Sequence, residues 1–176
     1  MTDKNKIIID TYLSPCGELL LGSYEGKLCL CDWNVPDRRE KTDKRIMAGL
    51  DAEYMQGSSE VLQLAKGMLD EYFARQRRTF DLPLLFVGSD FQKQVWETLQ
   101  GIPYGSCRSY SDLAASIGNP KAVRAVAAAN GANAISIIVP CHRVIGTDGS
   151  LTGYAGGLQA KRFLLNLETG NKHLAL

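Results

Sequence analysis

The sequence contains very little histidine: His142 and His173 are the only two among 176 residues. No histidine lies near Cys16, Cys29 and Cys31, the three cysteines of the first half. A structural zinc ion takes four cysteine or histidine ligands, and three thiols without an imidazole do not complete such a set. We therefore expect these cysteines to pack in the core and predict no metal site, with zinc as the alternative.

The sequence also lacks a secretion signal and a membrane-spanning run. Its start, Met1-Thr2-Asp3-Lys4-Asn5-Lys6, is polar, and the apolar run that follows is too short for a signal peptide. No apolar segment approaches the length that crosses a bilayer. The five cysteines are odd in number and irregularly spaced, which indicates reduced thiols. We therefore expect a cytoplasmic protein.

A strong excess of charge of either sign is absent as well, since the formal net charge is +1. The charge is uneven along the chain. Residues 1–88 hold 12 basic and 14 acidic residues, a net −2, whereas residues 89–176 hold 8 and 5, a net +3. A mildly basic second half is compatible with a polyanionic partner, and it does not by itself identify one. The length suits one large domain or two small ones.

Residues 1–88 are interpreted as a scaffold that begins with a three-stranded meander. Runs rich in branched and aromatic residues predict strands at 6–13, 18–24 and 27–33. The tight Glu25-Gly26 turn joins the second strand to the third. No residue pattern in this half indicates catalysis.

The rest of the first half is predicted to hold a loop, a helix and an edge strand. Residues 35–57 are charged and contain proline and glycine, so we interpret them as an exposed loop. Helical spacing of apolar residues predicts a helix over 58–77, which Ser58 or Ser59 can cap. Alternating apolar positions predict a strand over 79–87, at an edge because it contains a proline.

Two serine capping boxes in the second half predict the starts of two helices. Ser89 with Gln92 predicts a helix through about residue 100. Ser109 with Asp112 predicts a second, short helix. Both begin where a linker or loop gives way to apolar periodicity.

A third helix is predicted from Asn119 as cap and Pro120 at the first helical position. With the short helix before it, it forms a helix-turn-helix. Residues 121–130 are rich in alanine, so the backbone can approach another surface closely, and Lys121 and Arg124 are expected on the same side. One interpretation is a well-packed core helix with two solvated cations. The other is a recognition helix in a nucleic-acid groove, with Arg124 projecting.

The chemistry is expected in residues 137–145, which place Cys141 and His142 inside an apolar, β-branched run that we interpret as a buried strand. An isolated cysteine there would be a small core residue, but a buried titratable pair costs free energy unless it is hydrogen-bonded. A thiol attacks as thiolate, and an imidazole backed by a carboxylate can take its proton. Neighbours on a strand face opposite ways, so we expect a water to relay the proton. Glu168, near the end of the last predicted helix (158–168), is the candidate acid.

These motifs together resemble the family of methylated-DNA–protein-cysteine methyltransferases, the O6-alkylguanine-DNA alkyltransferases. The resemblance is strong over residues 89–170 and weaker before them. It is carried by Pro140-Cys141-His142-Arg143-Val144, Ser109-Tyr110, Asn119-Pro120-Lys121-Ala122-Val123-Arg124-Ala125-Val126, and Gly153-Tyr154-Ala155-Gly156-Gly157.

The resemblance implies an α/β chain of two domains. Residues 1–88 would be an RNase H-like scaffold, a three-stranded antiparallel sheet plus a helix. Residues 89–176 would be a winged helix-turn-helix domain that binds DNA and carries the active site. Some members hold zinc in the first domain, but this chain lacks the histidines there.

The resemblance also implies a catalytic set. Cys141 would accept the alkyl group, His142 would deprotonate it through water, and Glu168 would orient His142. Asn133 would brace the turn into the active-site strand, and Tyr110 would donate a proton toward the flipped guanine.

Further residues would contact DNA or line the base pocket. Arg124 would fill the gap left by the flipped nucleotide. The minor-groove contacts would come from Arg124, Lys121, Ala125, Ser109 and Tyr110. The base pocket would be lined by Tyr154, Ala155, Lys161 and Val144. Ala155 stands where some members have serine, so a hydroxyl contact to the base is lost there.

The predicted function is direct reversal of DNA damage. An enzyme that acts on a base inside a duplex must extrude it. A methyl group moved to sulfur forms a thioether, which has no carbonyl for water to attack, and no second nucleophile is evident to regenerate Cys141. We predict irreversible, stoichiometric repair of O6-methylguanine, and of O4-methylthymine, in double-stranded DNA by a monomer without cofactor or membrane.

Three alternatives remain. The first is a damage-binding module without chemistry, against which the presence of Cys141 argues. The second is a thiol hydrolase, although hydrolases usually bring cysteine and histidine from separate segments. The third is a helix-turn-helix regulator, in which Cys141 would be dispensable.

Overall fold

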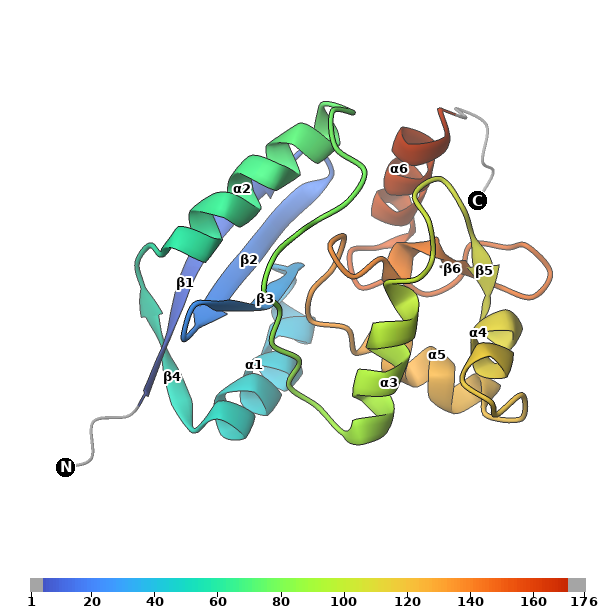
Figure 1. Ribbon diagram of the computed structural model, residues 1–176, viewed down its shortest axis with the longest axis horizontal. Helices are drawn as coiled ribbons and strands as arrows, with labels where there is room; N and C mark the ends of the chain where they lie inside the picture. The colour runs from blue at the N-terminus through green and yellow to red at the C-terminus, as the bar shows by residue number, and fades with distance from the viewer. Residues whose placement is uncertain (1–4, 171–176) are drawn as a thin grey trace. The chain divides into compact units, whose positions relative to one another are not determined.

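The computed structural model describes residues 5–170, and the chain divides into two compact units between Gly88 and Ser89 (Figure 1). Each unit has its own set of buried apolar side chains. Within the described residues, no helix combines the length and apolarity that crossing a bilayer would require.

The first unit is built on a four-stranded sheet. Its antiparallel meander is confirmed as β1 (Asn5–Ser14), β2 (Gly17–Tyr24) and β3 (Lys27–Trp33). A fourth strand, β4 (Ala52–Gln56), pairs in parallel with β1, so the order is β3-β2-β1-β4. The prediction of three strands was therefore incomplete.

The segment predicted as a loop is instead α1 (Pro36–Leu50) followed by β4. Proline at the start of α1 suits the first helical turn. The helix escaped prediction because ion pairs replace an apolar stripe on its buried side. Arg39 is buried and donates to Asp32 at 3.0 Å, and Arg38 donates to the same carboxylate at 2.8 Å. A prediction that relies on apolar residues at helical spacing does not detect such a helix.

The predicted helix after β4 is confirmed as α2 (Glu60–Phe73). Ser59 is its N-cap, and its hydroxyl accepts from the Leu62 amide at 3.3 Å. The buried residues follow the predicted apolar spacing and are Val61, Leu62, Ala65, Leu69 and Tyr72.

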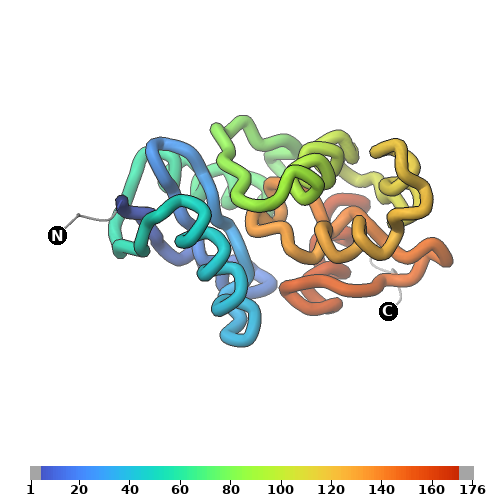
Figure 2. Tube along the Cα trace, turned by 90° about the horizontal axis from the view of Figure 1, so that it is seen from below, coloured from blue at the N-terminus to red at the C-terminus, as the bar shows by residue number. Residues whose placement is uncertain are grey.

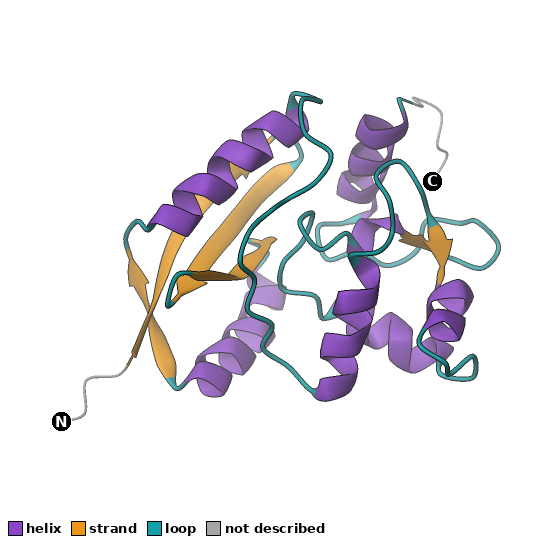
Figure 3. Cartoon of the chain, in the orientation of Figure 1, coloured by secondary structure: helices purple, strands orange, loops and turns teal. Residues whose placement is uncertain are grey.

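Residues 79–87 do not form the predicted edge strand and are drawn as loop in Figure 3. The segment touches the sheet at a single bridge, Leu28 with Leu84. The Leu28 amide donates to the Pro83 carbonyl at 2.8 Å, and the Leu85 amide donates to the Leu28 carbonyl at 2.9 Å. Pro83 has no N–H with which to extend the ladder.

The second unit is mainly helical. Its helices and short strands are α3 (Asp90–Leu99), β5 (Arg108–Ser109), α4 (Tyr110–Ser116), α5 (Val123–Gly131), a 3-10 turn (Cys141–Arg143), β6 (Val144–Ile145) and α6 (Leu158–Thr169). The Trp96 indole donates to the Ala129 carbonyl at 2.8 Å and ties α3 to α5. A long irregular segment, orange in Figure 2, connects α5 to α6.

Both capping boxes are confirmed. The Ser89 hydroxyl accepts from the Gln92 amide at 3.1 Å, and the Gln92 side chain accepts from the Ser89 amide at 2.9 Å. Ser109 and Asp112 make the equivalent pair, with both distances 3.0 Å. The two serines therefore set the starts of α3 and α4 as the sequence predicts.

The start of α5 was predicted wrongly. Asn119 and Pro120 form a turn, in which the Ala122 amide donates to the Asn119 carbonyl at 3.0 Å, and the helix begins at Val123. Lys121 therefore precedes the helix, and the argument that it shares a helical side with Arg124 does not hold.

The buried strand predicted over 137–145 is also wrong. Residues 141–143 form a 3-10 turn, and β6 is two residues long, parallel to β5. The apolar run is nevertheless buried from residue 133 to residue 144. Such a run reports burial and does not by itself distinguish a strand from packed turns.

Candidate active site

Asn133 organises the turns that lead to Cys141. Its side-chain amide donates to the Val139 carbonyl at 2.9 Å and the Ile135 carbonyl at 3.4 Å, while its oxygen accepts from the Ile135 amide at 3.0 Å. Ile137, between these points, has a left-handed backbone with φ of 71°. That conformation costs a β-branched residue roughly 1–3 kcal/mol, so the surrounding hydrogen bonds must hold it. Asn133 thus makes the contacts expected of a brace.

Cys141 begins the 3-10 turn and is 4% exposed. Its amide donates to the Val139 carbonyl at 2.8 Å. Successive side chains of a 3-10 helix project about 120° apart, because the helix has about three residues per turn. Cys141 and His142 therefore still point in different directions, although the predicted strand is absent.

His142 and Glu168 meet inside the unit, as predicted. Nε2 of His142 lies 2.8 Å from Oε1 of Glu168, and both side chains are fully buried. An ionised carboxylate only accepts hydrogen bonds, so Nε2 carries the hydrogen and Nδ1 carries the lone pair. Nδ1 has no hydrogen-bonding partner among the described residues. The imidazole is therefore set to accept a proton at Nδ1.

The protonation states follow from the surroundings. Burial lowers the pKa of His142 below its ordinary 6.5, with Arg143 and Lys161 acting the same way and Glu168 opposing them. Burial alone would raise the pKa of Glu168, but His142 and Arg143 outweigh it and hold that pKa below its usual range. At neutral pH the pair is a neutral imidazole hydrogen-bonded to a carboxylate.

Arg143 is the part of this site to which the sequence assigned no role. Its Nε donates to Oε2 of Glu168 at 2.9 Å, and its Nη2 donates to Oε1 at 2.8 Å. A third donor, Nη1, reaches the Ile102 carbonyl at 2.7 Å. The available signal was an arginine within an apolar run, since a buried guanidinium requires an anionic partner.

Lys161, which is predicted to line the base pocket, is a buried residue of α6. Its Nζ donates to the carbonyls of Val144 at 2.5 Å, Thr152 at 2.9 Å and Gly153 at 3.4 Å. Burial lowers the pKa of Lys161 to about 8, and the charge on a Cys141 thiolate would oppose that shift. The ammonium group therefore ties the loop after β6 to α6 close to the thiol.

Tyr110 opens α4 and points its hydroxyl toward the same loop. The hydroxyl donates to the Thr152 carbonyl at 3.2 Å. Burial raises the pKa of Tyr110, and a charge on Cys141 would act in the same direction, so the two groups are within electrostatic reach. Of the other predicted pocket residues, Val144 is fully buried and Tyr154 and Ala155 are half-buried.

The predicted DNA-contacting residues lie on the surface, apart from two at the start of α4. Lys121, Arg124 and Ala125 are exposed, whereas Ser109 and Tyr110 are half-buried. The Ser109 oxygen accepts from the Asp112 amide as the N-cap. One side of α5 is buried through Val126, Ala129 and Asn130. The helix is therefore packed on one side and presents a short alanine face on the other.

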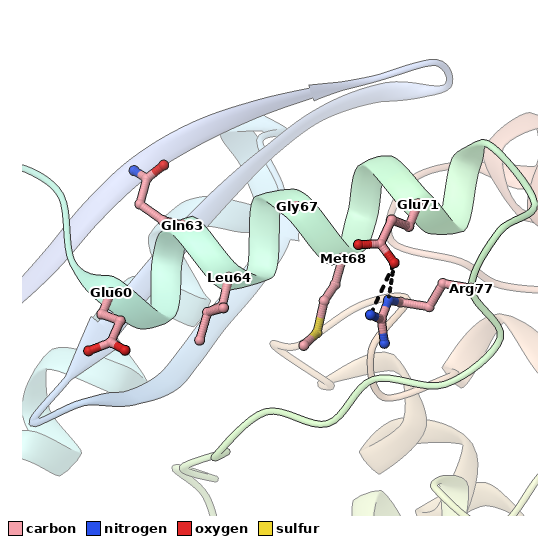
Figure 4. A pocket seen from close by; sticks show the side chains of 7 residues that line it. All are labelled: Glu60, Gln63, Leu64, Gly67, Met68, Glu71 and Arg77. Atoms are coloured by element: carbon pink, nitrogen blue, oxygen red, sulfur yellow. Dashed lines mark hydrogen bonds and ion pairs between the residues drawn. The ribbon is translucent and has the colours of Figure 1, made fainter.

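The first unit offers a different kind of surface. A groove of about 540 Å³ runs along α2 (Figure 4), lined by Glu60, Gln63, Leu64, Gly67, Met68, Glu71 and Arg77. It contains none of the predicted site residues. Of the three cysteines expected in the core, Cys29 and Cys31 lie there, whereas Cys16 is half-buried. Burial raises the pKa of Cys29 to about 12. Within residues 5–170, no group of three or more histidine, cysteine or acidic side chains is placed to hold a metal ion.

Family models match both units. The ribonuclease-like domain of 6-O-methylguanine DNA methyltransferase matches residues 7–86, and the DNA binding domain matches residues 90–170. A methylated-DNA–protein-cysteine methyltransferase of Methanosarcina barkeri is 46% identical over 162 residues, which cover 92% of this chain and 97% of that protein. The constitutive one of Bacillus subtilis is 58% identical over 105 residues, 59% of this chain and 64% of its own.

Solved structures agree over nearly the whole chain. The O6-methylguanine methyltransferase of Mycobacterium tuberculosis is 39% identical with a TM-score of 0.77, covering 96% of both chains. The Mycobacterium tuberculosis protein OGT in complex with DNA is 40% identical with a TM-score of 0.79, covering 94% of this chain and 93% of its own. Fold and comparisons together define a two-part protein with a ribonuclease-like and a DNA-binding domain. The chain belongs to the family of methylated-DNA–protein-cysteine methyltransferases.

Proposed function

We propose that this chain repairs O6-methylguanine in DNA by moving the methyl group onto Sγ of Cys141. The observation that carries the proposal is the buried Glu168–His142 pair, which presents the lone pair of Nδ1 from the residue next to the thiol. The family supports the reaction class, since its named members are methyltransferases that act on methylated DNA and a protein cysteine.

The first step is activation of the thiol. With the damaged base flipped out of the stack, Cys141 releases its proton through a bridging water to Nδ1 of His142. Glu168 accepts the hydrogen bond of the opposite nitrogen and stabilises the imidazolium that forms. Lys161 lies within electrostatic reach of the thiolate and favours it.

The second step is transfer of the methyl carbon. The S–C bond forms as the C–O bond breaks, and the electron pair moves onto the guanine ring. We assign Tyr110 as the donor of the proton that the departing guanine takes up, because its hydroxyl is within electrostatic reach of Cys141 and is held at the Thr152 carbonyl. Tyr110 then regains a proton from solvent and the His142 imidazolium releases one to solvent, so the proton lost by sulfur balances the proton gained by guanine.

The product is a thioether on Cys141, which water cannot hydrolyse. We therefore propose one methyl group per protein molecule, with no cofactor, and O4-methylthymine as a second substrate. Because the reaction consumes a reduced thiol, we place the protein in the cytoplasm, where thiols stay reduced.

DNA binding is assigned to the second unit, residues 89–176, with residues 1–88 as scaffold. We propose that a monomer places the exposed face of α5, with Ala125, against the minor groove. Arg124 would enter the base stack, and Lys121 and Ser109 would contact the backbone. The exposure of Arg124 and Lys121 and the absence of bulky side chains on this face support that arrangement.

The test is intact-protein mass measurement after incubation with a duplex that contains O6-methylguanine. We expect the mass to rise by one methyl group, located on the Cys141 peptide, with repair ending at one lesion per chain. Repair of many lesions per chain, or methylation elsewhere, would contradict the proposal. Binding to damaged duplex without any mass change would identify a damage-binding module instead.

A further inference from the structure

Arg143 is a buried cation of the second unit, and the proposed steps do not use its contacts. Its side chain is 7% exposed, and three of its nitrogen atoms donate hydrogen bonds. Two of them, Nε and Nη2, reach the two oxygens of Glu168 in the planar, bidentate arrangement that arginine forms with carboxylates.

The carboxylate of Glu168 is held on both oxygens. Oε1 accepts from Nε2 of His142 and from Nη2 of Arg143, both at 2.8 Å. Oε2 accepts from Nε of Arg143 at 2.9 Å and from the Gly105 amide at 3.3 Å. A carboxylate gripped in this way has one orientation relative to the imidazole.

Arg143 is itself held by the loop that leads to β5. Its Nη1 donates to the Ile102 carbonyl at 2.7 Å, and its guanidinium carbon lies 5.7 Å from the centroid of the Tyr104 ring, in cation–π range. Gly105, which donates to Glu168, belongs to the same loop. The orientation of Glu168 is thus fixed to the backbone through Arg143.

We propose that Arg143 is a positioning residue for methyl transfer, which fixes the Glu168 carboxylate so that the hydrogen of His142 stays on Nε2 and the lone pair stays on Nδ1. The inference rests on the proposed function. Without the bidentate grip, the carboxylate would keep one amide and one imidazole partner and could rotate. The hydrogen on Nε2 would then lose its fixed acceptor, and the tautomer with hydrogen on Nδ1 cannot take the thiol proton.

Charge adds a second effect. The charged groups that act on His142 are Glu168 and Lys161 from α6 and Arg143 from its own turn. Burial and then the charge of Glu168 raise the pKa of Cys107 in the loop before β5. Removal of the Arg143 cation would let the imidazole take up a proton at higher pH. Only the neutral imidazole accepts the thiol proton. The decline of the rate on the acid side of the pH profile would therefore begin at a higher pH.

The experiment compares Arg143→Gln, Arg143→Lys and a control, Arg162→Gln, in the full chain. Arg162 is a half-buried arginine of α6 with no assigned role. The measurement is the single-turnover rate of methyl transfer from O6-methylguanine duplex at saturating DNA, from pH 5 to pH 8, with DNA affinity and the final number of methyl groups per chain.

For Arg143→Gln we expect the rate to fall roughly 10- to 100-fold, as for other residues that orient a catalytic group. That is less than the roughly 10²–10⁴-fold contribution of the general base itself. DNA affinity and the final single methyl group should be unchanged, and the acid limb should move to higher pH. Arg143→Lys keeps the positive charge but cannot form the bidentate hydrogen bonds to Glu168. Its rate should therefore stay low, while its pH profile should return toward that of the wild type. Arg162→Gln should match wild type.

A wild-type rate and pH profile in Arg143→Gln would overturn the inference. The inference would also be overturned if fewer Arg143→Gln molecules took up a methyl group but those molecules reacted at the wild-type rate. That result would indicate that Arg143 has a structural role only. If Arg143→Gln does not fold, a folded Arg143→Lys with the wild-type rate overturns it equally. A wild-type chain that transfers no methyl group would instead refute the proposed function.

Discussion

Both units contain buried cysteines, but the residues around these cysteines differ between the units. Cys29 and Cys31 of β3 are 2% and 0% exposed, and Cys141 is 4% exposed. Burial raises the pKa of Cys29 to about 12 and that of Cys31 strongly, the latter with help from the neighbouring Asp32. Cys141 is equally covered, but an imidazole follows it and Lys161 lies within electrostatic reach. Similar burial therefore yields inert thiols in one unit and a candidate nucleophile in the other.

Replacement of the thiol gives the largest expected effect. Cys141→Ala should abolish methyl uptake from O6-methylguanine duplex, because no other described cysteine has an imidazole next to it. Intact-protein mass measurement checks this, with Cys29→Ala as the matched control in β3. A methyl group on the Cys141→Ala protein would show that Cys141 is not the nucleophile and would contradict the distinction between it and the buried thiols of the first unit.

The next effect is on the relay. Glu168→Gln should slow methyl transfer by roughly 10²–10⁴-fold, the usual contribution of general acid–base catalysis. A glutamine amide turned toward Nε2 would donate to it and force the hydrogen onto Nδ1. Single-turnover kinetics at saturating DNA measure the change, and Glu97→Gln on the exposed side of α3 is the control. An unchanged rate would show that the relay does not distinguish Cys141 from the other buried thiols.

A smaller effect is expected on the DNA face of the second unit. Arg124→Ala should weaken binding to damaged duplex by about 1–3 kcal/mol, while Lys121→Ala should reduce the salt dependence of binding by about one phosphate contact. Titration of labelled duplex at several salt concentrations tests both. Arg78→Ala in the first unit serves as control, and an equal loss there would contradict the assignment of DNA binding to residues 89–176.

Acidification should have a modest effect. His142 must be neutral to accept the proton, and its pKa lies below 6.5. The rate should fall by less than about twofold from pH 8 to pH 6.5, and about tenfold per unit below the pKa. The pKa of Glu168 is held below its ordinary 4.5. The ionised carboxylate therefore contributes its full share of folding stability above pH 4.5, and this share is lost only as the pH falls through the lowered pKa. Time courses of methyl uptake check this, and half-maximal activity above pH 7 would contradict it.

The smallest effect on the chemistry is expected in the first unit. Cys31→Ser places a hydroxyl in an apolar core and should cost about 1–3 kcal/mol of unfolding free energy. The methyl-transfer rate of the folded protein should not change. Urea unfolding followed by kinetics on the same preparation measures both, and a slower reaction would give the first unit a part in the chemistry.

The sequence predicted the elements whose signals are local. The serine capping boxes placed the starts of α3 and α4, and apolar spacing placed α2. It missed α1, because Arg39 and Asp32 are buried as an ion pair and their partnership is not visible in a hydrophobic pattern. It misjudged the surroundings of Cys141 for a related reason: burial there comes from turns held by Asn133, and only the folded chain brings those atoms together.

The site was predictable in part. The proximity of His142 and Glu168 was expected from the resemblance and from the position of Glu168 on the last helix, and the contact is present. The grip of Arg143 on Glu168 was not expected, since the two residues are 25 positions apart. The role of Lys161 in lining a base pocket stays a prediction, and its hydrogen bonds to the Val144 and Thr152 carbonyls were not expected. Such roles depend on contacts that only the folded chain brings together.

The alanine face of α5 has a consequence for selectivity. Ala125 and Ala128 are exposed beside Arg124, and a methyl group has neither a hydrogen-bond donor nor an acceptor. Bases are told apart by patterns of donors and acceptors at their edges. If α5 contacts DNA as proposed, this face would follow any run of nucleotides with equal ease, and the choice between a normal and a damaged base would fall to the residues around Cys141.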